Sequence, residues 1–186
     1  MILLVLLGVE GYTQSSEYTY TPDGSLLFAD VVEKEEQNQQ ALYALAVQEF
    51  SKGKKNKIRK NEDDKTISLS KSFTLFEKGI LSRIPYSEIQ YQLLMEFKDG
   101  RYRYQYKDFA FLPYERNRYG KYEVVQRKRK SLEDVIQNDQ VWSKYNEEFA
   151  NRIQAEIEDI IRKMNVQVDQ PKEDSASNVI HLDKEW

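Results

Sequence analysis

Hydrophobic and polar residues alternate across residues 89–106, apart from Leu94, and the dipeptide Asp99-Gly100 divides the alternation into two halves. Asp-Gly accepts the positive φ angles that both central residues of a two-residue type I′ turn require. Around such a turn Glu96 faces Arg103, and the apolar residues of both strands lie on one face. A slip of one residue would destroy this match. The pattern therefore predicts a β-hairpin in one defined register.

Three other segments have the pattern of strands. Residues 25–32 form a short apolar run, and residues 122–125 form a shorter one. Residues 66–76 alternate between apolar and polar until Lys71 interrupts them. This pattern predicts a strand with a β-bulge near that lysine.

Apolar residues at helical spacing indicate two helices. The first, at residues 38–51, precedes Gly53, which is typical of a helix end. The second, at residues 141–164, has a stripe spaced by three or four residues, made of Trp142, Tyr145, Phe149, Ile153, Ile157, Ile160 and Met164. Between them, Ser131 followed by Asp134 predicts the cap of one helical turn.

The order of these elements predicts an α+β fold, because a sheet with one apolar face needs helices to cover it. We expect an antiparallel sheet of four to five strands with two helices on one face, in the order β-α-β4-α. We expect this domain at residues 25–165, after a linker at residues 14–24 and before a disordered tail at residues 166–186.

The first residues predict export from the cell. Residues 1–7 (MILLVLL) have the composition of the apolar region of a secretory signal, with cleavage after Gly11 or Thr13. The expected signal is therefore residues 1–13, and the expected location is periplasmic or secreted. A buried N-terminal strand is the alternative. The run is too short to cross a membrane, which takes about 20 apolar residues.

Composition gives little support to an enzyme. The 186 residues include no cysteine and one histidine, His181, in the expected tail. Thiolate chemistry is thereby excluded, and a Ser-His-Asp triad or a histidine metal site is disfavoured. The sequence has no nucleotide-binding or metalloprotease motif. We expect a protein without catalytic residues, cofactor or metal, and the net charge of -3 gives no general attraction to nucleic acid.

Two segments are rich in basic residues. Residues 52–60 contain six, but three acidic residues follow at 62–64, so a solvated turn is the prediction and nucleic-acid binding the alternative. Residues 114–130 mix arginine and lysine with tyrosine, a combination that binds phosphate and stacks bases. An exposed loop is the preferred interpretation of this second segment, because the chain as a whole is acidic.

The face of the sheet opposite the helices is the candidate ligand site. Two helices cover one face only, so the other is either solvated or bound to a partner. Guanidinium groups beside amides suit carboxylates, phosphates or sugars. The polar residues that the hairpin register places on this face are Gln90, Gln92, Glu96, Arg101, Arg103 and Gln105.

Three stretches resemble a family of unknown function. They are Gln40-Ala41-Leu42-Tyr43, the hairpin motif of residues 98–104 (KDGRYRY) and the closing amphipathic helix. The family has a TBP-like fold and occurs mainly in secreted or envelope proteins of Bacteroidetes. The resemblance covers about Asp30 to Met164 and implies the order β-α-β4-α. It implies no catalytic residues, and TBP-like describes topology without implying DNA binding.

Three functions remain open at this point. The leading hypothesis is an exported, non-catalytic binding or interaction module, with an envelope protein or glycan as its partner. The alternative is a carboxylate-dependent hydrolase of envelope polymers, which would need a deep cleft with two or more carboxyl groups of raised pKa. A weaker alternative is nucleic-acid binding through residues 114–130.

Overall fold

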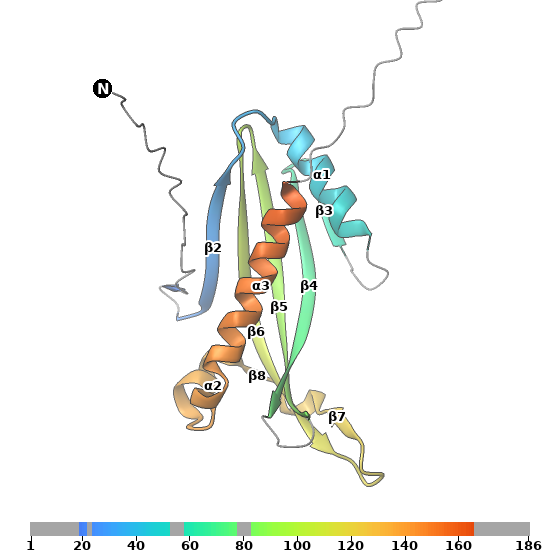
Figure 1. Cartoon of the computed structure of the whole chain (residues 1–186), viewed down its shortest axis with the longest axis vertical. Helices are drawn as coiled ribbons and strands as arrows, with labels where there is room; N and C mark the ends of the chain where they lie inside the picture. The colour runs from blue at the N-terminus through green and yellow to red at the C-terminus, as the bar shows by residue number, and fades with distance from the viewer. Residues whose placement is uncertain (1–18, 22–23, 53–57, 78–82, 166–186) are drawn as a thin grey trace, which may run out of the picture.

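An antiparallel sheet with helices packed on one face forms the molecule (Figure 1). The computed structural model describes residues 19–21, 24–52, 58–77 and 83–165. Its strands are β1 (Thr19–Tyr20), β2 (Leu26–Glu33), β3 (Ile58–Asn61), β4 (Thr66–Glu77), β5 (Ile84–Lys98), β6 (Arg101–Arg116), β7 (Tyr122–Val124) and β8 (Lys130–Ser131). Its α-helices are α1 (Gln39–Ser51), α2 (Leu132–Asn138) and α3 (Asn146–Met164). None of these helices has the length and apolar character needed to cross a membrane.

The strands lie in the order β1-β2-β6-β5-β4-β3, and β7 and β8 pair with β6 outside this path. Along the chain, β2, α1, β4 to β7 and α3 correspond to the segments from which the order β-α-β4-α was predicted. The predicted counts were wrong, because the described residues contain eight strands and three α-helices. The additional elements are short: β1 and β8 have two residues each, β3 has four and α2 has seven. β1 and β8 are too short to show a period, whereas α2 begins at the predicted Ser131 cap.

The central hairpin of β5 and β6 has the predicted register, with Glu96 opposite Arg103 and Lys98 opposite Arg101. The predicted type I′ turn was wrong, because Gly100 has a φ of 74° while Asp99 does not have a positive φ. The carboxylate of Asp99 instead accepts the backbone N–H of Gln39 at 2.8 Å, at the first residue of α1. The turn therefore takes the shape that lets its aspartate cap a helix.

The core lies between the helices and the sheet. The predicted apolar stripe of the C-terminal helix is buried in full, and α1 adds Leu42, Leu45 and Phe50 to the same cluster. Figure 1 shows α3 running across the face of the sheet, with α1 beside its end. The Ser131 hydroxyl accepts the N–H of Asp134, so the predicted cap is present and begins α2.

The C-terminal helix begins later than predicted. Residues 142–144 form a 3-10 turn, and α3 starts at Asn146. Trp142 and Tyr145 are three residues apart, and this spacing fits both an α-helix and a 3-10 helix. The sequence pattern therefore could not distinguish the two helix types. The turn brings Trp142 to 1% exposure in the core.

Further differences concern the edges of the sheet. The predicted bulge near Lys71 was wrong, since β4 pairs regularly there and shifts register between Leu75 and Phe76. The predicted solvated turn at residues 52–60 is partly strand β3, paired with β4. Within the expected linker, β1 pairs with β2. The expected signal and tail lie outside the described residues.

Candidate functional site

The face of the sheet opposite the helices is open. All six predicted residues lie on it: Gln90, Gln92 and Glu96 alternate along β5, and Arg101, Arg103 and Gln105 alternate along β6. Gln92, Arg101 and Arg103 are exposed, and the other three are half-buried. β4 adds the exposed residues Ser70 and Ser72. The structure thus places these side chains on one surface, named here the open face.

The six residues do not form one site, because two separate hollows divide them. The hollow at the turn of the hairpin, named here the tip hollow, has a volume of about 270 Å³. It is lined by Val31, Glu96, Lys98, Arg101, Tyr102 and Arg103. The hollow beside the register shift in the middle of β5, named here the bulge hollow, has a volume of about 550 Å³. It is lined by Ser70, Lys71, Ser72, Gln90, Tyr91, Gln92, Asp108 and Arg129. Gln105 lines neither of them.

The cations of the tip hollow differ in their bonding. Arg103 donates from Nε to a Glu96 carboxylate oxygen at 2.6 Å and also contacts that oxygen through Nη2. Arg101 and Lys98 form no ion pair or hydrogen bond through their side chains with any described residue. They nevertheless lie directly opposite each other in the register of β5 and β6. Like charges in that position repel each other.

The bulge hollow contains residues that the sequence did not identify. The register of β5 and β6 shifts between Gln90 and Gln92, and Asp108 in this region has a φ of 56°. Arg129 reaches back to the sheet and its Nη1 lies 3.5 Å from Oε1 of Gln90. Arg129 is 39 residues away from Gln90 along the chain. Only tertiary structure could have brought it to this face.

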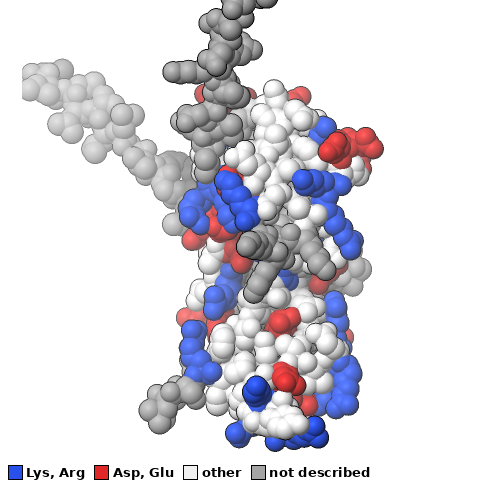
Figure 2. Space-filling model, turned by 90° about the vertical axis from the view of Figure 1, so that its right-hand side faces the viewer, with Lys and Arg blue, Asp and Glu red and all other residues white. Residues whose placement is uncertain are grey.

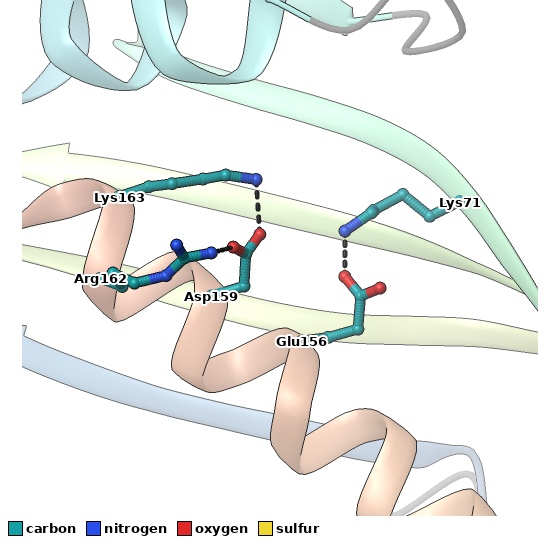
Figure 3. Close-up of polar contacts among 5 residues, drawn as sticks. All are labelled: Lys71, Glu156, Asp159, Arg162 and Lys163. Carbon is teal, nitrogen blue, oxygen red and sulfur yellow. Dashed lines mark hydrogen bonds and ion pairs between the residues drawn. The ribbon is translucent and has the colours of Figure 1, made fainter.

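A polar cluster lies on the helix side of the sheet, between α3 and β4 (Figure 3). Lys71 forms an ion pair with Glu156, and Asp159 is paired with Arg162 and Lys163. Burial raises the pKa of Asp159, but hydrogen bonds from Lys163 and Arg162 outweigh it and leave this pKa below its usual value. Burial also raises the pKa of Tyr91 and Tyr106. Carboxylates already paired with cations, and phenols that stay protonated because their pKa is raised, are poor nucleophiles and poor general bases near neutral pH.

A third hollow, of about 550 Å³, lies where β4 ends and α3 begins. It brings together Glu77, Glu147 and Glu148 with Arg83 and Arg152. Glu77 and Glu147 are exposed to solvent. A carboxylic acid that donates a proton near neutral pH needs a water-poor environment, which exposed glutamates lack. In the described part of the chain, no group of three His, Cys, Asp or Glu residues is placed to hold a metal ion.

The basic segment at residues 114–130 is not the loop that we predicted. It contains the end of β6, strand β7, a 3-10 turn at Gln126–Lys128 and the start of β8. β6 and β7 form a hairpin that extends away from the body of the molecule (Figure 1). At its turn Tyr119 is 71% exposed, with the Arg118 guanidinium 4.7 Å from its ring centre. Lys128 pairs with Glu115, which neutralises part of the basic charge.

Charges on the side of the molecule seen in Figure 2 are mixed. Lysine and arginine alternate with aspartate and glutamate over the visible surface, and no large area has one sign. A uniform basic surface is the usual sign of a nucleic-acid interface. This view gives no support to such an interface on that side.

The fold and the site together define a class of protein: an α+β domain of TBP-like topology with one polar sheet face open to solvent. Two solved structures are similar to it in fold. One is a TBP-like protein from Parabacteroides distasonis, with a TM-score of 0.57 and 18% identity over 81% of this chain and 97% of that one. Another is a DUF4468 family protein from Bacteroides ovatus, with a TM-score of 0.52 and 14% identity over 86% of this chain and 95% of that one.

At these identities the likeness concerns the fold alone. No protein-family model matches the sequence, and no curated protein matches it. Function must therefore be argued from the site.

Proposed function

We propose that this protein is an exported, non-catalytic binding module that holds its partner on the open face. One observation carries the proposal: the face has two hollows lined by charged, amide and hydroxyl side chains, and the cations Lys98 and Arg101 have no counterion among the described residues. Polar groups on a solvated face are common, but unpaired like charges placed opposite each other oppose folding. Binding sites commonly carry such a cost in stability.

A protein partner suits the open face better than a glycan. Val31 is the only exposed large hydrophobic residue of the described part of this face, at 45% exposure. The exposed tyrosines lie elsewhere, on β1 and on the hairpin of β6 and β7. A sugar ring would therefore find no exposed aromatic surface there on which to stack. Amide, hydroxyl and guanidinium groups instead match the polar rim of protein interfaces.

The hydrolase and nucleic-acid alternatives have weaker support. The hollow with three glutamates leaves two of them exposed, which does not favour a protonated acid. The basic hairpin has a stacked Arg118–Tyr119 pair at its turn, but part of its charge is neutralised by Glu115. A binding module remains the better interpretation.

Site-specific photo-cross-linking in the cells that make the protein tests the proposal. A photoreactive amino acid at Gln92, exposed on the open face, should give a discrete cross-linked adduct. The same amino acid at Glu158, exposed on α3, is the matched control and should give none. Adducts from Glu158 alone, or from neither position, would contradict the use of this face.

A further inference from the structure

Three features of the charged residues around the tip hollow would be explained by one kind of ligand group. The two unpaired cations of the hollow, Lys98 and Arg101, extend from directly opposed positions of β5 and β6. The nearest acid along β5, Glu96, is already bound by Arg103. Glu33 lies opposite Arg101 on the other side, in β2, but forms no ion pair with it. The result is a pair of cations beside a hollow with no counterion supplied by the described residues.

The backbone around this pair is firmly held. The N–H of Lys34 donates to the carbonyl of Gly100 at 2.6 Å, and the N–H of Gly100 donates to the carbonyl of Gln37 at 2.9 Å. With the Asp99 contact to Gln39, these bonds connect the hairpin turn to the start of α1. The two cations therefore project from a rigid support, which lowers the entropic cost of binding.

We propose that Lys98 and Arg101 form a clamp for a carboxylate, supplied by an acidic side chain of a protein partner on the open face. This inference rests on the proposed function and names the chemistry of its ligand. An anion between the two cations would remove their mutual repulsion and accept hydrogen bonds from both, as charge-assisted pairs do. Arg101 presents a planar fork that fits both carboxylate oxygens, while Lys98 adds a compact point charge. Exposed Val31 lines the same hollow and offers apolar contact to the carbons of the acidic side chain.

The test is a titration of the full-length ¹⁵N-labelled protein with a tri-glutamate peptide, followed by NMR at constant ionic strength. Signals of Lys98 and Arg101 should shift and saturate. The double variant Lys98→Gln with Arg101→Gln should bind the peptide about tenfold more weakly. The matched control, Lys144→Gln with Arg152→Gln, removes two exposed positive charges elsewhere and should change the affinity less than about twofold. An equal loss in both variants would show general attraction and overturn the clamp.

A single variant separates binding from folding. Lys98→Glu places an acid opposite Arg101, so we expect a higher urea midpoint together with loss of peptide binding. A lower midpoint with binding intact would overturn the argument. Inorganic phosphate at the same ionic strength is the competing anion, and tighter binding of phosphate than of the peptide would overturn the carboxylate assignment. The NMR signals of Lys98 and Arg101 could fail to shift while a photoreactive amino acid at Gln92 still gives an adduct. That outcome would show that the clamp is wrong and would leave the proposed binding module intact.

Discussion

The ion pair of Lys71 and Glu156 offers a quantitative test of how this fold is held together. Lys71 interrupts the alternation of β4, and its side chain points from the sheet toward α3 (Figure 3). β3 pairs with β4 only as far as Leu69, so beyond it the outer side of β4 has no described partner strand. A lysine that points inward from an edge strand hinders pairing with another chain. This explains why a charge lies where the pattern calls for an apolar residue.

The contribution of this ion pair to the free energy of unfolding depends on how exposed the two side chains are. The exposure is 18% for Lys71 and 28% for Glu156. Exposed pairs contribute about 0–1 kcal/mol, and breaking a fully buried pair costs about 3–5 kcal/mol. We therefore expect Lys71→Met or Glu156→Gln alone to lower the free energy of unfolding by about 1–2 kcal/mol. The coupling energy of the pair should be about 1 kcal/mol.

Urea unfolding of the four proteins of a double-mutant cycle measures this coupling. The control cycle uses Lys128→Met with Glu115→Gln, a pair in which both side chains are more than 40% exposed, 49% and 43%. Its coupling should be below about 0.5 kcal/mol. Sedimentation at high concentration should also show self-association of Lys71→Met and not of Lys128→Met. Equal coupling in the two cycles, with no association, would refute the role given to Lys71.

Four further predictions concern other parts of the chain. Gly100→Val should destabilise the protein by about 1–3 kcal/mol in urea, because valine is strained at a φ of 74°; an unchanged midpoint would refute this. Asp159 has a lowered pKa when folded, so the stability that Asp159→Asn removes should be present at pH 7 and disappear as the pH falls below about 4. Burial raises the pKa of Tyr104 to about 12, so between pH 10 and 12 stability should fall as pH rises, with tyrosinate absorbance appearing together with unfolding. Intact mass of the protein from the cell envelope should show removal of about the first eleven to thirteen residues, and full-length cytoplasmic protein would contradict export.

Alternation along the chain was enough to predict the central hairpin and its register. The period of a strand is two residues and the turn is local, so a slip would move every apolar residue of the hairpin to solvent. The stripe from Trp142 to Met164 was predictable for the same kind of reason, since one face of a helix must be buried. Together with α1 and the apolar runs at residues 25–32, 66–76 and 122–125, these two elements predicted the order β-α-β4-α with one polar sheet face.

Tertiary structure decided what the open face can do. The turn at Asp99 departs from type I′ because its carboxylate binds the start of α1, a segment 60 residues away. Arg129 joins the open face only because β8 pairs with β6. Arg103 donates a hydrogen bond to Glu96, whereas Arg101 lies opposite the like charge of Lys98. Residue type alone does not predict this difference between the two arginines. Periodicity assigns a residue to a face, but which charges on that face stay unpaired depends on contacts between segments distant in sequence.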